Sequence, residues 1–212
     1  LNELEEITKG HYVLLLTTPG FSRRGVVARV RKLIGPSLVH VVDTIGHNPE
    51  LDDLEMTSRT LKSLRVSMIV ALGGGSVIDS AKVMSVMLST GETFSLRDHL
   101  ENGSGELDGV GIPIVAVPTT AGTGSEVTPF ATVWDSRNRK KHSLAGPQLF
   151  PRVALLDPTM TLSLPRRLTI VTGLDTISHA LESIWNRNAN AITVMYATEA
   201  LKIAVSTLKT AV

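Results

Sequence analysis

Short and almost uninterrupted apolar runs, separated by amphipathic stretches, constrain the fold of this chain more than any other feature. Such runs are typical of strands buried on both faces, as in a parallel sheet that helices cover on each side. Hydrophobic periodicity predicts helices between the runs. The predicted strands are Tyr12–Leu16, Val39–Val42, Met68–Leu72, Ile114–Val117 and Val153–Leu156, and the predicted helices are Arg23–Leu33, Leu51–Leu64 and Val77–Ser89.

The pattern changes near Leu162–Pro165, after which no further strand is predicted. Leu168–Trp185 and Ala191–Leu208 show apolar residues at helical spacing. We therefore predict a Rossmann-like α/β domain over residues 1–160 and the start of an all-helical domain over residues 161–212. A helical part of about fifty residues is hard to stabilise alone. We expect further sequence, the first domain or a partner chain to cover it.

Composition narrows the classes of function. The chain has 212 residues, 42% of them hydrophobic, with a net charge of +1 and no cysteine. The near-neutral charge argues against a nucleic-acid partner. The absence of cysteine removes disulfides, thiolate metal sites and cysteine nucleophiles, and suits a cytoplasmic protein. The apolar runs are shorter than the ~18 residues of a membrane span, and the acidic start is unlike a signal peptide, so we expect no membrane partner.

Three glycines directly follow the third predicted strand and open a helix. Gly73, Gly74 and Gly75 have no Cβ, so the backbone can turn sharply and approach a ligand closely. The free N–H groups of the following helix suit a pyrophosphate. We predict Ser76 as the N-cap and Asp79 as a partner that bonds back to the helix start, as in a capping box. The alternative is a tight turn without a ligand, since the motif differs from G-x-G-x-x-G and does not follow the first strand.

A polar segment follows the fourth predicted strand, from Pro118 to Thr128. Its hydroxyls and N–H groups can bind ribose or phosphate without adding charge. The alternative is an ordinary surface loop, but two such segments at the ends of two parallel strands favour a nucleotide site. The candidate cofactor-binding threonines are Thr119, Thr120, Thr123 and Thr128.

A carboxylate and an imidazole share one face of a predicted helix. Asp175 and His179 are four residues apart, so their side chains are neighbours on the helix surface. Such a pair can bind one divalent metal. The alternative is an exposed pair with no ligand.

These three motifs, in this order, resemble those of the iron-containing (group III) alcohol dehydrogenase family, whose architecture is shared with dehydroquinate synthase. The resemblance implies that Gly73 to Ser76 bind the pyrophosphate, that Thr119, Thr120 and Thr128 line the adenosine and ribose, and that Lys141 lies near the ribose and nicotinamide. It assigns Asp175 and His179 as metal ligands for Fe²⁺, with Zn²⁺ as the alternative. Two further histidine ligands of the family occur much later and are not in this sequence.

The resemblance implies hydride transfer between NAD(P)(H) and a small alcohol or aldehyde, in a homodimer. Asp43, at the end of the second strand, favours NAD(H), whereas Arg23 and Arg24 would tolerate the phosphate of NADP(H). Residues 181–190 are similar to the phosphonoacetaldehyde reductase subgroup, in which Arg187 would bind an anionic substrate or else cap its helix. The alternatives are a nucleotide-binding module without catalysis and a polyol dehydrogenase of the same fold.

Overall fold

The computed structural model describes residues 1–90, 94–102 and 110–212. The chain forms two compact units. The first comprises residues 1–118 and 125–157, and the second comprises residues 119–124 and 158–212. The break at residues 157 and 158 lies close to the boundary predicted at residue 160. The separate grouping of residues 119–124 was not predicted.

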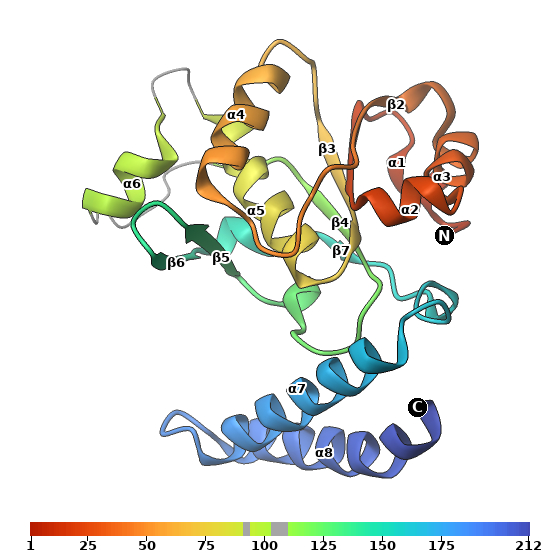
Figure 1. The fold of residues 1–212 in the computed structure, drawn as a ribbon, viewed down its shortest axis with the longest axis vertical. Coiled ribbons are helices and arrows are strands. Elements are labelled where there is room, and N and C mark those ends of the chain that lie inside the picture. The colour runs from red at the N-terminus through yellow and green to blue at the C-terminus, as the bar shows by residue number, and fades with distance from the viewer. Residues whose placement is uncertain (91–93, 103–109) are drawn as a thin grey trace. The chain divides into compact units, whose positions relative to one another are not determined.

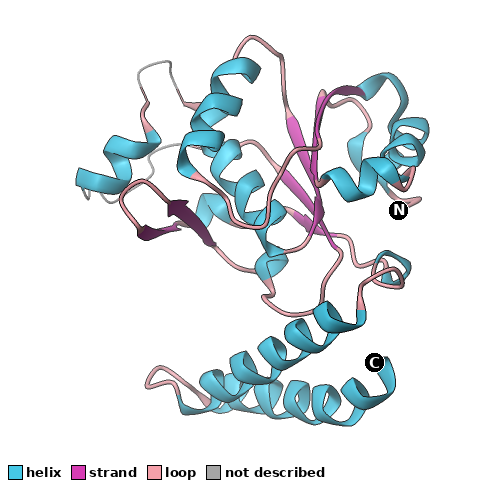
Figure 2. Cartoon of the chain, viewed as in Figure 1, coloured by secondary structure: helices cyan, strands magenta, loops and turns pink. Residues whose placement is uncertain are grey.

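The first unit is built on a five-stranded parallel sheet, drawn in magenta in Figure 2. The strand order is β2-β1-β3-β4-β7. Each strand lies within two residues of its predicted position. The runs of β1, β3 and β4 are buried throughout, which leaves them little choice of register, whereas β2 and β7 are partly exposed. The α/β prediction with a parallel sheet is confirmed. The strands are β1 (Val13–Thr17), β2 (Leu38–Val42), β3 (Met68–Gly73), β4 (Ile114–Pro118) and β7 (Val153–Ala154).

Helices cover both faces of this sheet (Figure 1). The chain runs from β1 to β2 in one direction and then from β2 past β1 to β3 and β4 in the other. Right-handed crossovers therefore place the helices after β1 on one face and those after β2 and β3 on the opposite face. The helices of this unit are α1 (Leu4–Thr8), α2 (Pro19–Arg23), α3 (Val26–Ile34), α4 (Leu51–Leu61), α5 (Gly75–Ser89) and α6 (Leu96–Asn102).

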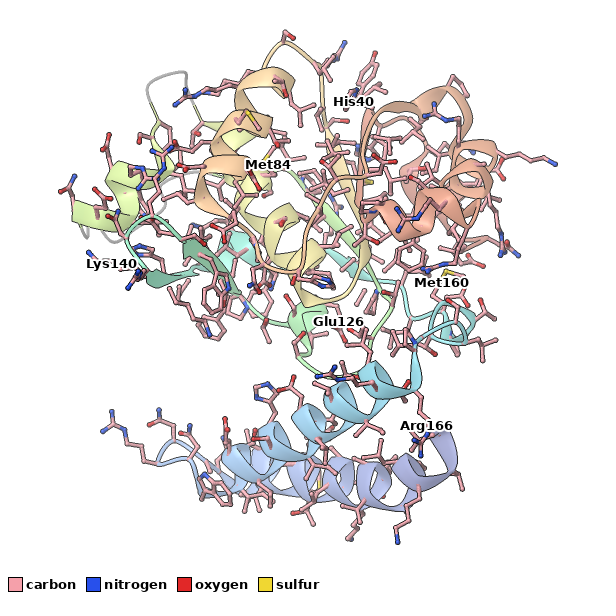
Figure 3. The ribbon with its side chains drawn as sticks, viewed as in Figure 1. His40, Met84, Glu126, Lys140, Met160 and Arg166 are labelled. Carbon is pink, nitrogen blue, oxygen red and sulfur yellow. The ribbon has the colours of Figure 1, made fainter. Side chains whose placement is uncertain are left out.

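Helix α5 forms the centre of the core. Its buried residues are Val77, Ile78, Ser80, Ala81, Lys82, Val83, Met84, Ser85, Val86 and Met87. Met84, labelled in Figure 3, is fully buried and belongs to the same hydrophobic cluster as Leu14 and Ile69 of the sheet. A helix with apolar or small residues on most of its faces is expected only in the interior of a protein. Accordingly, α5 packs against the sheet on one side and against α4 and β5 on others.

The structure corrects two predictions of secondary structure. The predicted helix Arg23–Leu33 is two helices, because Gly25 adopts a left-handed conformation (φ 76°) between α2 and α3. A hairpin of β5 (Phe130–Asp135) and β6 (Lys140–Ala145) was not predicted. Only Ala131, Val133 and Asp135 of β5 are buried, and β6 carries mostly exposed polar residues, so the hairpin has no continuous apolar run.

The second unit contains two long helices, α7 (Arg166–Trp185) and α8 (Ala191–Ala211). They form an antiparallel hairpin (Figure 1). The Nε of Arg166, which is labelled in Figure 3 at the start of α7, donates to the carbonyl of Val212 (3.0 Å). Asn190 caps α8 by accepting from the N–H groups of Ile192 and Thr193. The helical start of a second domain is therefore as predicted.

Helix α8 is also the one described helix that is long and apolar enough to cross a bilayer. Its most apolar window has a mean hydropathy of 1.2 and is 6% buried. Length and composition alone are weak evidence, because the core helix of a soluble protein has the same properties. That the protein has no membrane partner stays a prediction.

An ion-pair cluster joins α4, α6 and the β5–β6 hairpin. The guanidinium of Arg97 contacts Asp52 (2.7 Å), Asp135 (3.0 Å) and Glu101 (3.3 Å). Asp135 is almost fully buried. The pKa of the Asp135 carboxyl lies below its ordinary value of 3.8. The hydrogen bonds from Asn138 contribute most to this lowering, and those from Arg97 add to it.

We predict that Arg97→Met lowers the melting temperature at pH 7, because it leaves the buried Asp135 carboxylate without its cation. A carboxyl with a lowered pKa stabilises the fold above its unfolded pKa and loses that contribution as the pH falls through its folded pKa. The deficit should therefore shrink below about pH 4. Melting curves at both pH values test this, with Lys9→Met of the exposed Lys9–Glu6 pair as the control. An equal deficit in both variants would contradict it.

Candidate functional site

The glycine turn is shaped by the contact of β3 with α5. Gly73 ends β3, and a Cβ at this position would lie 2.4 Å from Cγ2 and 2.6 Å from Cβ of Val77. The N-cap of α5 is Gly74, whose carbonyl accepts from the N–H groups of Val77 and Ile78. The N–H groups of Gly75 and Ser76 lie in the first turn and have no intrahelical acceptor. They are available to bind a pyrophosphate, which the positive end of the helix dipole also favours.

The predicted capping arrangement is wrong. Ser76 is not the N-cap, since α5 begins at Gly75 and is capped at Gly74, two residues before Ser76, and no side chain caps the helix. The hydroxyl of Ser76 donates instead to the carbonyl of His47, in the loop after β2. The Asp79 carboxylate turns away from the helix start and accepts from the hydroxyl of Ser125 (2.6 Å) and from the N–H of Thr132 (2.9 Å). That Ser76 and Asp79 contact a cofactor stays a prediction.

The strand order explains why the glycine turn follows the third strand. The topological switch point of the sheet lies between β1 and β3, where helices leave toward opposite faces, and ligands of open α/β sheets bind at such points. The hydroxyl of Thr17, at the end of β1, donates to the carbonyl of Leu72 in β3 (2.7 Å). The N–H of Ile45, after β2, donates to the carbonyl of Thr17 (3.2 Å). The carboxyl ends of β2, β1 and β3 are thus tied together.

Asp43 lies at this edge of the sheet, directly after β2. It is half-buried, and its carboxylate accepts from the hydroxyl of Ser22 in α2. This bond orients the carboxylate beside the switch point. The two neighbouring arginines, Arg23 and Arg24, are both exposed, and the guanidinium of Arg24 stacks over the ring of Phe21 (4.5 Å).

Two of the predicted cofactor residues belong to the first unit but lie away from the glycine turn in sequence. Thr128 accepts a hydrogen bond from the Nζ of Lys82 (3.3 Å). Lys141 is exposed on β6, with its Nζ 5.5 Å from the ring centre of Trp134. Neither position tests the cofactor contact that was predicted for it.

The threonines directly after β4 belong to the second unit, where their segment packs on α7. Thr119 is buried, Thr120 is half-buried and Thr123 is exposed. The hydroxyl of Thr176 donates to the carbonyl of Ala121 (3.4 Å). A Cβ at Gly122 would lie 3.3 Å from Oδ2 of Asp175. The segment predicted to bind the cofactor thus lies against the predicted metal ligand within one unit.

Asp175 and His179 do share one face of α7. The Oδ1 of Asp175 lies 3.5 Å from the Nε2 of His179, and both side chains are about half exposed. Glu182, one helical turn further along α7, has a carboxylate oxygen 3.9 Å from the Nδ1 of His179. In the described ranges no group of three or more metal-binding side chains occurs. The pair fits two ligand positions of a divalent metal, whereas catalytic sites use three or more protein ligands.

Sequence reasoning missed a buried lysine. Lys82 has no exposed surface, and its Nζ donates to the hydroxyl of Ser125 (2.9 Å) and to the carbonyl of Phe130 (2.7 Å), besides Thr128. Burial lowers the pKa of the Lys82 ammonium to about 8, although the nearby Asp79 and Glu126 carboxylates act in the opposite direction. A single cation within a helix of small and apolar residues was the signal that could have found it.

The Gly73 contact gives a direct prediction. Gly73→Ala should destabilise the fold by about 1–3 kcal/mol, because its Cβ would overlap the β-branched side chain of Val77. Urea unfolding measures this. Gly46→Ala is the matched control, since a Cβ there meets no atom within 4 Å. Equal stabilities of the two variants would refute the packing role of Gly73.

The chain is similar to known oxidoreductases over most of its length. Residues 1–158 match the family description "Iron-containing alcohol dehydrogenase". The phosphonoacetaldehyde reductase of Streptomyces viridochromogenes is 34% identical over 90% of this chain and 49% of its own length. The choline dehydrogenase of Bacillus subtilis is 32% identical over 93% of this chain and 50% of its own length. The chain therefore spans about half the length of these relatives.

Solved structures show the same fold. The sulfoacetaldehyde reductase of Bifidobacterium kashiwanohense, solved in complex with NAD⁺, superposes with a TM-score of 0.90 at 29% identity, covering 98% of this chain and 55% of that one. An iron-containing alcohol dehydrogenase of Thermotoga maritima gives a TM-score of 0.84 at 31% identity, covering 99% and 57%.

Proposed function

Because the chain belongs to the iron-containing alcohol dehydrogenase family, we propose that it binds NAD(P)(H) and takes part in hydride transfer between the nicotinamide and a small alcohol or aldehyde. The observation that carries the proposal is the glycine turn at the switch point, where a buried strand opens directly into α5 with free N–H groups. The matched relatives are about twice as long, so catalysis by the whole protein is part of the proposal.

Each group has a role in this proposal. The N–H groups of Gly75 and Ser76 bind the pyrophosphate, and Asp43 accepts from the 2′-hydroxyl of the adenosine ribose. Asp175 and His179 hold two positions of a divalent metal, iron by family with zinc as the alternative. When bound, such a metal supplies Lewis acidity toward a substrate oxygen. The cofactor carries the hydride, and the protein orients it.

The substrate class that we propose is a short aldehyde, and more narrowly one that carries an anionic group. Two of the similar proteins are named as reductases of phosphonoacetaldehyde and sulfoacetaldehyde, which are both two-carbon aldehydes with an anionic group. Arg187 is a weaker candidate for binding that group. It lies beyond the end of α7, eight residues after His179, and makes no hydrogen bond or ion pair with the residues described.

A second candidate function is nucleotide binding without catalysis. The observation that favours it is the incomplete ligand set around Asp175 and His179 in the described part of the chain. We also propose a cytoplasmic location, in keeping with the absence of cysteine, and a homodimer, which the family resemblance implies.

Titration with NADH, followed by its fluorescence, tests the binding step, and aldehyde-dependent NADH oxidation tests the reaction. Binding with turnover supports the dehydrogenase. Binding without turnover, at saturating iron or zinc, supports the second candidate. No binding of NADH or NADPH would refute both. Turnover of acetaldehyde but of neither phosphonoacetaldehyde nor sulfoacetaldehyde would refute the narrower substrate class.

Cofactor preference should depend on Asp43. We predict that Asp43→Ser raises the Kd for NADH and lowers the Kd for NADPH, each by about tenfold, because it removes one charge-assisted hydrogen bond and the repulsion of a phosphate. Fluorescence titrations with both cofactors measure this. Asp53→Ser, on the exposed side of α4, is the control. An unchanged ratio of the two Kd values would exclude Asp43 from the ribose site.

Metal binding should depend on α7. We predict that His179→Ala lowers the affinity for Fe²⁺ or Zn²⁺ at least tenfold, because it removes a ligand. Equilibrium dialysis with elemental analysis measures bound metal without any assay of activity. His11→Ala, in the first unit, should leave it unchanged. Equal metal content in the wild type and in both variants would show that α7 is not the site.

A further inference from the structure

Two oppositely charged residues of α5, the half-buried Asp79 and the buried Lys82, have no assigned role in the proposed chemistry. Asp79 and Lys82 are three residues apart and therefore neighbours on one side of the helix. Both side chains are directed at residues 125–132. Lys82 donates to Ser125, Thr128 and Phe130, and Asp79 accepts from Ser125 and Thr132. The hydroxyl of Ser125 is thus held by both charges.

The held segment directly continues the threonine-rich one. Residues 119–124 lie between Pro118, the last residue of β4, and Ser125, the first residue of a 3₁₀ turn (Ser125–Val127). Pro118 is fixed because it pairs in register with Gly73 of β3. Ser125 is fixed because it contacts Asp79 and Lys82. The two residues that flank the segment in sequence, Pro118 and Ser125, are therefore held by β3 and α5.

The electrostatic cost of the pair argues that it does more than stabilise the fold. Burial raises the pKa of Asp79 and lowers that of Lys82, so each charged form is disfavoured by its surroundings. Opposite charges placed in a protein interior are often no more stabilising than apolar residues of similar volume. A core helix without another buried charge could have used apolar residues at both positions.

We propose that Asp79 and Lys82 are positioning residues, which hold Ser125 to Phe130 on α5 and thereby set the geometry of the threonine-rich segment for the cofactor. This inference rests on the proposed function, since it assumes that Thr119 and Thr120 contact the dinucleotide. It differs from the expectation that Asp79 itself contacts the cofactor. Both carboxylate oxygens of Asp79 already accept hydrogen bonds from protein groups.

The proposal predicts a dependence on pH. Lys82 is charged below about pH 8 and loses its proton above it. The neutral amine has two donors for its three acceptors, so the hold on residues 125–130 weakens as the pH rises through that value. The charged groups that act on the pair are Glu126 on the 3₁₀ turn, which favours the ammonium, and Lys141 on β6, which favours the Asp79 carboxylate.

The test uses the full chain with the double substitution Asp79→Asn and Lys82→Met. Lys82→Met alone would remove the cation near the half-buried Asp79 carboxylate, which risks misfolding, so the double variant keeps the test interpretable. Lys32→Met, on the exposed face of α3, is the matched control. Three quantities are measured: the melting temperature, amide hydrogen exchange of residues 119–130, and the Kd for NADH between pH 6.5 and 9.

We expect the double variant to melt within a few degrees of the wild type, while its residues 119–130 exchange at least about tenfold faster and its Kd for NADH rises about tenfold. The Kd of the wild type should rise above about pH 8, and this step should be absent from the double variant. A loss of melting temperature with unchanged exchange and unchanged Kd would overturn the proposal in favour of a purely structural pair.

The proposed function and this inference fail in different ways. A wild-type chain that binds no NADH refutes the proposed function, and amide exchange in the absence of cofactor still decides whether the pair holds the segment. A wild-type chain that binds NADH, together with a double variant of equal affinity, refutes only the positioning role.

Discussion

The close contact between Gly73 and Val77 determines how the first unit is built. A strand that ends on a residue without a side chain lets α5 begin almost at once, so the helix lies directly on the sheet. This contact keeps α5 enclosed and explains why most of its residues are buried. It also places the free N–H groups of the first helical turn at the carboxyl edge of the sheet. Packing and ligand binding therefore both depend on the backbone at Gly73. The packing of α5 on the sheet requires a glycine there even when no ligand is bound.

Most of the sheet could be predicted because burial on both faces leaves a strong pattern. Runs such as Met68–Leu72 and Ile114–Val117 are too apolar and too short for anything but buried strands. The β5–β6 hairpin could not be found in this way. In this hairpin only β5 alternates buried residues with more exposed ones, and β6 is largely polar. What fixes it is tertiary contact, such as the N–H of Trp134 donating to the carbonyl of Pro49.

The candidate site was predictable in its residue types and less so in its geometry. Glycines after a strand, and an aspartate four residues before a histidine on a helix, are local patterns, and spacing alone places them. The orientation of Asp79 was mispredicted because its partners, Ser125 and Thr132, lie about fifty residues away in sequence. Lys82 was missed for the same reason. A buried charge becomes intelligible only when the groups that satisfy it are known.

The grouping of residues 119–124 with the helices has a consequence for how such a chain can be divided. The polypeptide leaves the parallel-sheet unit after Pro118, returns to it at Ser125, and leaves it again after Asp157. Neither unit is one continuous stretch of sequence, so no single cut in the peptide chain separates them into intact halves. Recombination within a gene exchanges continuous stretches. Exchanging the helical unit at one junction would leave behind residues 119–124, which pack on α7. The two units are therefore expected to be exchanged together, as one piece.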